Sequence, residues 1–133
     1  MSKKGPVTLA LVGAGARGEL NLATLARKHR DRMKFVAVAE RDDDRRRLFV
    51  DRFDIAPQNA FRDWRELFGK PRLADAAINA LPCRMHYEST LAGLRAGYHT
   101  FLEKPMALEP GQCVHLTREA EARPVPARGP EDR

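Results

Sequence analysis

Residues Val7 to Gly18 read VTLALVGAGARG, and this stretch decides the fold class. The apolar run Val7–Val12 predicts a buried strand, and the three glycines after it are spaced as G-x-G-x-x-G before a helical pattern. In that spacing Gly13 makes the tight turn, Gly15 lets a pyrophosphate approach, and Gly18 packs the helix against the strand. The same spacing occurs by chance in ordinary strand turns, so the loop alone leaves both interpretations open.

A helix that begins near Arg17 would direct its free N–H groups and the positive end of its dipole toward bound phosphates. The glycine loop and this helix start therefore form one predicted phosphate site. Its expected members are Gly13, Gly15, Ala16, Arg17 and Gly18.

Strand-like and helix-like patterns alternate along the chain, which is typical of strand-helix-strand units and a parallel sheet. The predicted strands are Val7–Val12, Lys34–Ala39, Asn59–Phe61, Asp75–Leu81 and His99–Leu102. The predicted helices are Arg17–Arg30, Asp42–Phe53, Asp63–Phe68, Met85–Ala96 and Gln112–Ala122. We therefore predict an α/β fold of the Rossmann type: three layers, about five parallel strands, and helices on both faces.

This domain is expected to span residues 1–122. Three prolines follow in RPVPARGPEDR, and proline has no N–H to give to a central strand. We therefore expect residues 123–133 to be disordered or frayed rather than to form a sixth strand.

Helical periodicity predicts which side chains of the first two helices share a face. On the first helix these are Leu22, Leu25 and Ala26, and on the second they are Leu48, Phe49 and Phe53. Asp63 is expected to cap a short helix, and Gly97 to end the next long one. Trp64 is interpreted as core or rim packing rather than as a platform for a cofactor.

The chain has a formal net charge of +6, and the whole excess falls within residues 1–52, around the glycine loop. That charge could steer an anionic cofactor, but a solvated arginine-rich surface is the simpler interpretation. Nucleic-acid binding is not expected, because acidic residues interrupt the basic ones and no aromatic side chains are interleaved to stack bases.

Cys83 and Cys113 have no spacing typical of a zinc site or a disulfide framework, so no metal is expected and a reducing cytoplasm is the predicted location. Lys3 and Lys4 before an apolar run imitate a secretory signal, but that run is better interpreted as the first strand. No segment approaches the roughly 18 apolar residues of a membrane span.

Glu40 closes the second predicted strand about 20 residues after Gly18, the spacing at which an acid meets the adenosine ribose. A carboxylate there accepts hydrogen bonds from the ribose hydroxyls and repels a 2′-phosphate, so it favours NAD over NADP. Arg41 complicates this prediction, because an adjacent arginine can admit NADP or stack on adenine.

Two tripeptides end the fourth and fifth predicted strands, Leu81-Pro82-Cys83 and Glu103-Lys104-Pro105. Ligands of such sheets bind outside the carboxyl ends of the strands. At these positions the chain resembles the N-terminal domain of the glucose-fructose oxidoreductase, inositol dehydrogenase and MocA (Gfo/Idh/MocA) family, over about residues 5–122. The resemblance rests on GAGARG at 13–18, VAVAE at 36–40, DAAINALPCRMHYE at 75–88 and AGYHTFLEKPMAL at 96–108.

The resemblance implies a nicotinamide-dependent oxidoreductase that acts on sugars, cyclitols or related polyols. It places Lys104 near the nicotinamide and the reacting hydroxyl, where an ammonium stabilises charge on oxygen and can relay a proton. It places Glu103 near the nicotinamide ribose, and Pro105 in a fixed turn for which a cis bond is one possibility.

Leu81, Pro82 and His86 are added to the expected cofactor site on the same resemblance, although His86 is interpreted mainly as a helix-start or packing residue. Cys83 departs from the family, which usually has asparagine there. An inert small residue is the favoured interpretation of Cys83, because nothing in the sequence specifies a thiolate.

Family members continue into a substrate domain that supplies the acid-base pair and most of the sugar pocket, and this domain is expected to be absent here. One hypothesis is therefore the cofactor domain of such an enzyme, truncated and weakly active or inactive alone. The other is a stand-alone NAD(H)-binding sensor or partner-interaction module, which could form a homo-oligomer through the surface left uncovered.

Overall fold

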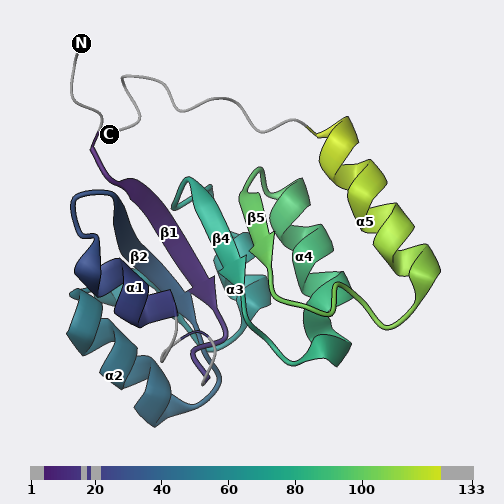
Figure 1. Ribbon diagram of the computed structural model, residues 1–133. Helices are drawn as coiled ribbons and strands as arrows, with labels where there is room; N and C mark the ends of the chain where they lie inside the picture. The colour runs from purple at the N-terminus through teal and green to yellow at the C-terminus, as the bar shows by residue number, and fades with distance from the viewer. Residues whose placement is uncertain (1–4, 16–17, 19–21, 124–133) are drawn as a thin grey trace.

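The computed structural model describes residues 5–15, 18 and 22–123. Within them a single parallel sheet has the strand order β3-β2-β1-β4-β5 (Figure 1). The strands are β1 (Val7–Val12), β2 (Met33–Ala39), β3 (Ala60–Phe61), β4 (Ala76–Asn79) and β5 (His99–Leu102). The predicted α/β class and the parallel sheet are confirmed.

Helices cover both faces of this sheet, as expected for three layers (Figure 1). Helices α1 and α2 lie on one face, α3 and α4 lie on the other, and α5 packs against the outer side of α4. Their bounds are α1 (Ala23–Lys28), α2 (Asp43–Phe53), α3 (Trp64–Phe68), α4 (His86–Arg95) and α5 (Pro110–Ala122).

Strand alternation divides the core into two halves, one on each face of the sheet. Leu9 and Leu11 of β1 face α1 and α2, where Phe35 and Phe49 form an edge-to-face pair with ring centroids 5.2 Å apart. The neighbouring β1 residues, Ala10 and Val12, face α3 and α4 and pack in a cluster with Trp64, Leu67 and Tyr98. Both halves fix the strands whose ends carry the candidate site.

Two predicted contacts of the helices with the core are wrong. Leu25 of α1 is 46% exposed, and the buried residues of this helix are Ala23 and Ala26. Leu48 of α2 is 47% exposed, because the residues that meet the sheet are Phe49, Val50 and Phe53. In each helix the buried face is therefore rotated about the helix axis from the predicted one. Small or aromatic side chains make the close contact with the sheet.

Several boundaries also differ from the predicted ones. Strand β4 is shorter than Asp75–Leu81, and α5 begins two residues early because Pro110 occupies its first turn, where proline is tolerated. Asp63 caps α3 by accepting a hydrogen bond from the Arg65 N–H, and Gly97 follows α4 at φ 89°, both as predicted. The expected start of the first helix near Arg17 and most of the predicted tail lie outside the described residues.

The strand order creates a place where a ligand can enter. Strand β1 lies between β2 and β4, so the connections that leave β1 and β4 at their carboxyl ends run to opposite sides of the sheet. Sheets of this kind bind ligands in the crevice at that switch point. The residues that follow β1, β2, β4 and β5 all reach this edge (Figure 1).

Two polar side-chain contacts join helix α5 to α4, one between Glu119 and Arg95 and one between His115 and Tyr87. The Glu119 carboxylate accepts hydrogen bonds from Arg95 Nη2 at 3.3 Å and, at the end of its own helix, from Arg123 Nε at 2.9 Å, and His115 Nε2 lies 3.5 Å away. The hydrogen bond from Arg123, then that from Arg95, holds the pKa of Glu119 below its usual value. Of the described α5 side chains only Leu116 is buried, so these contacts matter for the docking of the helix.

Acidification is expected to loosen α5 before the sheet. A carboxyl with a lowered pKa in the folded state stabilises the fold above its unfolded pKa and loses that contribution as pH falls through its folded pKa. Amide-exchange protection in α5 should therefore decrease at pH values below about 4, where glutamate ordinarily gains its proton, while β1 stays protected. Glu119→Gln should remove this pH dependence, and α5 protection that stays constant down to acid unfolding would contradict the prediction.

Candidate functional site

A cavity of about 700 Å³ opens at the carboxyl edge of the sheet, beside the ends of β1, β2 and β4. Its walls come from the glycine loop, the start of α2, the start of α3 and the segment before α4. The residues that line it are Gly13, Gly15, Ala39, Glu40, Arg41, Asp42, Arg45, Arg62, Asp63, Trp64, Arg65, Ala80, Leu81, Pro82, Arg84 and Met85. The predicted residues Gly13, Gly15, Glu40, Arg41, Leu81 and Pro82 therefore lie around one cavity.

The glycine loop has the geometry that its spacing predicts. Gly13 has φ 90°, its N–H donates to the Ala39 carbonyl at 2.9 Å, and a Cβ there would lie 2.9 Å from the backbone of Ala80. A Cβ at Gly18 would overlap the carbonyl oxygen of Gly13. Gly13 and Gly18 are required by backbone packing, whereas Gly15 is open toward the cavity. Ala16 and Arg17, also predicted to bind the cofactor, lie outside the described residues.

Glu40 joins the end of β2 to the glycine loop. Its carboxylate accepts hydrogen bonds from the Ala14 N–H at 2.6 Å and the Asp42 N–H at 3.0 Å. A carboxylate offers about four acceptor positions, so two remain for further hydrogen bonds. Glu40 thus positions the loop in addition to facing the cavity, a role that the sequence interpretation did not include.

Arg46 supports the same strand end from α2. Its guanidinium donates to the Glu40 carbonyl oxygen at 2.8 Å and to the Asp43 carboxylate at 2.7 Å. The hydrogen bond from Arg46 and the charge of nearby Arg62 lower the pKa of Asp43. Asp43 therefore stays ionised at neutral pH, next to the positive end of α2.

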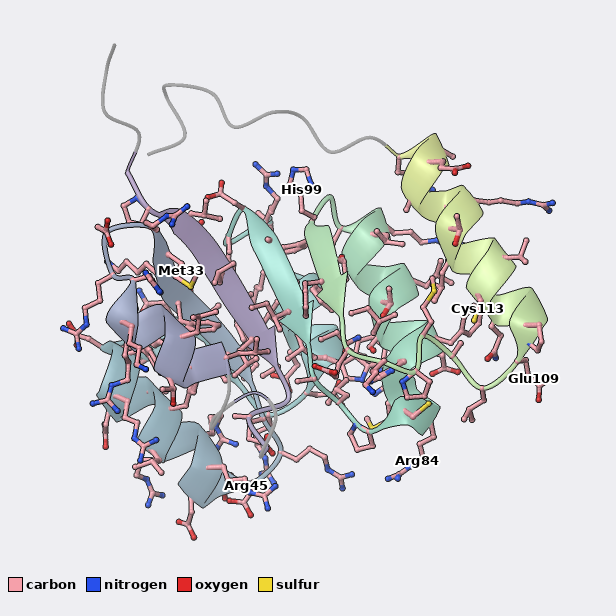
Figure 2. All side chains as sticks on the ribbon, viewed as in Figure 1. Met33, Arg45, Arg84, His99, Glu109 and Cys113 are labelled. Carbon is pink, nitrogen blue, oxygen red and sulfur yellow. The ribbon has the colours of Figure 1, made fainter. Side chains whose placement is uncertain are left out.

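Five arginines and three acidic residues line the cavity, so its wall carries a net positive charge. Arg62 lies 3.8 Å from Asp43, and Arg65 pairs with Asp63 while stacking 4.2 Å above the Trp64 ring. Arg41, Arg45 and Arg84 make no ion pair with another residue of the described chain. Figure 2 shows Arg45 and Arg84 at the same lower edge of the molecule, reaching out from α2 and from the segment before α4.

Arg45 lies beside Gly15 of the glycine loop. Its Nη1 is 4.0 Å from the position that a Cβ would take at Gly15, so the guanidinium stands beside the most open part of the turn. By its sequence alone, Arg45 is one of several charges on a solvated helix face. The signal that could have found Arg45 is its place in the first turn of the helix after Glu40, which projects toward the strand edge.

Trp64 combines a packing role with a place in the cavity wall. It is only 8% exposed and belongs to the core cluster beneath α3, as predicted. Its Nε1–H is buried and has no hydrogen-bond partner among the residues that the structure describes. Because Trp64 also borders the cavity, it gives a fluorescence signal there.

The end of β4 is fixed by a buried polar network. The Asn79 side-chain nitrogen donates to Ser89 Oγ at 2.7 Å and Thr90 Oγ1 at 3.0 Å, and its oxygen accepts from the Leu81 N–H at 3.3 Å. A backbone bond from the Glu103 N–H to the Asn79 carbonyl, 3.1 Å long, joins the ends of β4 and β5. This network holds Leu81 in the wall of the cavity.

The Glu103-Lys104-Pro105 turn follows β5 and contains a cis Lys104–Pro105 bond, the possibility that the sequence raised. Lys104 is exposed, Glu103 is half-buried, and neither lines the cavity described above. The Pro105 carbonyl is bound by His86 Nδ1 at 2.7 Å and faces Cys83 Sγ at 3.8 Å. The contacts predicted for Glu103 and Lys104 with a cofactor remain predictions.

His86 lies beneath the site. It is 1% exposed, and its second ring nitrogen, Nε2, lies 2.7 Å from the Leu81 carbonyl oxygen. Both ring nitrogens therefore face protein atoms. The geometry assigns His86 to packing and positioning, not to direct contact with a cofactor.

Other features of the described chain are less informative. A cavity of about 300 Å³, lined in part by Met33, Phe35 and Phe53, lies at the opposite end of β2, and the glycine loop has no part in it. No cluster of His, Cys, Asp or Glu in the described residues has a geometry that could hold a metal ion. None of the described helices has the length and apolar composition needed to cross a membrane.

A parallel sheet with a glycine loop after its first strand, an acid after its second and a cavity at the switch point defines a dinucleotide-binding domain of the Rossmann type. The sequence profile of the oxidoreductase family with an NAD-binding Rossmann fold matches residues 7–128. The chain therefore belongs to the Gfo/Idh/MocA oxidoreductase family, as its NAD-binding Rossmann domain.

Comparisons with individual proteins agree. An uncharacterized oxidoreductase of Synechocystis is 27% identical over 129 residues, which span 95% of this chain and 33% of that relative. The WlbA dehydrogenase of Chromobacterium violaceum, solved with NADH and UDP-GlcNAcA, has the same fold, with a TM-score of 0.82 and 23% identity over 92% of this chain and 34% of that one.

The biliverdin reductase of Synechocystis, solved with biliverdin and NADP⁺, superposes with a TM-score of 0.76 and 25% identity over 89% of this chain and 35% of that one. The chain spans about a third of the length of the relatives it matches.

Proposed function

We propose that this chain binds the adenosine and pyrophosphate parts of NAD(H) in the cavity at the switch point and presents the nicotinamide near the end of β5. The observation that carries the proposal is the convergence of Gly13, Glu40 and Leu81, each at the end of a different strand, on one cavity. Three strand ends meeting at the switch point is the arrangement by which this fold holds a dinucleotide.

The reaction we propose for the whole protein is hydride transfer to or from a hydroxyl carbon of a sugar, cyclitol or related polyol. Lys104 stands exposed on the turn after β5, where its ammonium can stabilise negative charge on the reacting oxygen. Glu103 on the same turn would hydrogen-bond the nicotinamide ribose. Positioning the substrate against the nicotinamide is a large part of catalysis, so this domain alone should turn over sugars weakly or not at all.

Titration with NADH and with NADPH tests the binding function. Trp64 is the single tryptophan and borders the cavity, so its fluorescence reports occupancy, and calorimetry gives an independent measure. Saturable binding is expected, with NADH preferred because the Glu40 carboxylate repels a 2′-phosphate. The absence of saturable binding of either cofactor into the millimolar range would reject the proposal.

Arg45→Ala is expected to weaken NADH and NADPH to a similar extent, by roughly threefold to tenfold, the effect of one partly solvated charge-assisted contact. The reason is the position of the guanidinium beside Gly15, where the pyrophosphate shared by both cofactors passes. Arg47→Ala is the matched control, because Arg47 carries the same charge on the same helix but is 71% exposed and pairs with Asp44. A loss confined to NADPH would instead place Arg45 at the 2′-phosphate.

A second candidate function is a partner-binding module. Apolar side chains are exposed on β5, on the segment after it and on α5, and they include Phe101 at 58% exposed and Leu108 at 64%. Apolar surface of this kind marks interaction sites when it is contiguous. A stable dimer in solution, measured by light scattering, would favour this candidate, and a monomer would favour the cofactor domain of a larger enzyme.

A further inference from the structure

The second cavity, of about 300 Å³, takes no part in the cofactor site and shares no lining residue with it. It is enclosed by the end of α1, the start of β2 and the end of α2. Figure 2 labels Met33 in its wall and Arg45 in the wall of the cofactor cavity, toward opposite ends of the molecule. A volume of this size is at the lower end of the range for small-molecule sites.

The floor of this cavity is apolar and largely aromatic. Phe35 and Phe53 meet edge to face, with ring centroids 5.2 Å apart, and Ala26 and Met33 extend the apolar surface. Phe35 is buried, but Phe53 and Met33 are only half-buried, so part of this surface is open to the cavity. A flat apolar group placed there would be removed from water against aromatic rings.

The rim of the cavity carries three cationic side chains and one carboxylate. Arg30 follows α1, Lys34 lies in β2 and Arg52 lies in the last turn of α2, so three separate segments bring a cation to the same place. Asp54, directly after α2, is the acidic residue. The rim therefore has an excess of two positive charges above an apolar floor.

Most of the positive charge of the chain lies near this cavity and not near the glycine loop. Residues 27–34, RKHRDRMK, hold five lysine or arginine residues and one aspartate, against a net charge of +6 for the whole chain. Basic residues near the end of a helix complement its dipole, which explains Arg52 and Arg30 at the ends of α2 and α1. That explanation does not extend to Lys34, which lies in a strand.

Arg30 and Lys34 are exposed, and neither forms an ion pair with another residue of the described chain. We propose that this cavity binds a small organic monocarboxylate, with its apolar body against Phe35 and Phe53 and its carboxylate between Arg30 and Lys34. A guanidinium donates two parallel N–H groups to a carboxylate, and an ammonium adds a further donor. Asp54 on the same rim repels a second negative charge, which favours a monoanion.

Naphthoate, a flat aromatic monocarboxylate, tests this proposal on the 133-residue chain, followed by nitrogen-15 NMR of the backbone amides. Saturable shifts are expected at Lys34, Phe35 and Asp54 and not at Gly13 or Gly15, with a dissociation constant on the order of a millimolar for a ligand of this size. Naphthalenemethanol, a neutral analogue of the same shape, should bind about tenfold more weakly. Added salt should weaken naphthoate and leave the neutral analogue unaffected.

Substitution of the two cations tests their role. Arg30→Gln combined with Lys34→Gln should weaken naphthoate by about tenfold, roughly threefold for each exposed charge-assisted contact. Arg27→Gln combined with Lys28→Gln is the matched control, because it removes the same two charges from exposed side chains of α1 that do not line the cavity. The control should keep the parental affinity within about twofold, since distant exposed charges are screened.

Replacing the acidic residue of the rim should have the opposite effect. Asp54→Asn is expected to tighten naphthoate binding by about threefold, because the negative charge beside the carboxylate is removed. Asp54 has φ 51°, a left-handed conformation that asparagine also adopts, so the variant should fold like the parent. Asp51→Asn, at an exposed position of α2 outside the cavity, is the control and should leave the affinity unchanged.

The proposal does not depend on the cofactor, because the two cavities have separate walls. Naphthoate that binds beside Phe35 in a chain without measurable NADH affinity would reject the proposed function and support this site. The proposal is overturned by the absence of saturable shifts up to about 10 mM naphthoate. It is also overturned by shifts confined to the glycine loop, or by parental affinity in the Arg30→Gln, Lys34→Gln chain.

Discussion

Replacing Gly13 with alanine is expected to destabilise the chain by about 3 kcal/mol and to abolish measurable NADH binding, because a left-handed backbone and a backbone clash act together. Gly13 has φ 90°, and a Cβ on it would lie 2.9 Å from the carbonyl carbon and oxygen of Ala80 and 3.0 Å from the Leu81 nitrogen. These are backbone atoms at the end of β4, so no side-chain rotation relieves the contact. The clash could be relieved only if β1 and β4 moved apart, which would disrupt the crevice between their carboxyl ends.

Two further glycine variants separate folding from binding. Gly111→Ala is the control for folding, since none of the described atoms that could clash lies within 4 Å of the added methyl and the residue is in α5, away from the cavity. Among the residues that the structure describes, the methyl of Gly15→Ala meets only the Arg45 guanidinium, at 4.0 Å, so this variant should fold normally and lose NADH affinity. Urea denaturation and cofactor titration measure the two effects. A Gly13→Ala chain with parental stability and affinity would show that the turn is not where the structure places it.

Replacing Glu40 with alanine should weaken NADH binding by at least about tenfold, because it removes the proposed ribose acceptor and the partner of two backbone N–H groups. The carboxylate is bonded to the Ala14 N–H at 2.6 Å and to the Asp42 N–H at 3.0 Å, so the glycine loop loses its attachment to β2. Binding of NADPH should fall less than binding of NADH, since repulsion of the 2′-phosphate disappears with the charge.

Asp44→Ala is the matched control for this substitution. It removes the same charge from the first turn of α2, at a side chain that is 94% exposed and does not line the cavity. Glu40→Gln separates the two roles, because the amide oxygen still accepts a hydrogen bond while the charge is gone. Parallel calorimetric titrations with both cofactors measure the outcome. An NADH affinity unchanged in Glu40→Ala would remove Glu40 from the binding site.

The local features of the site could be predicted because they depend on residues close together in sequence. Gly13 and Gly18 are needed for a turn and a helix contact within one short segment, and Glu40 follows a strand whose apolar run is plain. The cap at Asp63 and the helix end at Gly97 are equally local, and the structure shows both. Backbone conformation and hydrogen bonding over a few residues fix these positions.

Contacts between distant segments could not be predicted in this way. Leu25 and Leu48 fit an apolar stripe by periodicity but are nearly half exposed, since the orientation of each helix is set by close contact of Ala26 and Phe49 with the sheet. Arg45 looked like one of many solvated charges, and only the approach of α2 to the glycine loop brings it beside Gly15. The position of a charged residue in the sequence does not show which part of the folded chain its side chain meets.

The sequence by itself determined the class of fold, the glycine loop and the acid at the end of β2, because each follows from a short pattern with a fixed backbone consequence. Only the tertiary structure showed that Glu40 also holds the loop and that His86 bridges Leu81 and Pro105. Those contacts join strand ends that are distant along the chain. The physical reason is the parallel sheet, which brings the carboxyl ends of separate strands to one edge and so makes neighbours of residues that no local pattern connects.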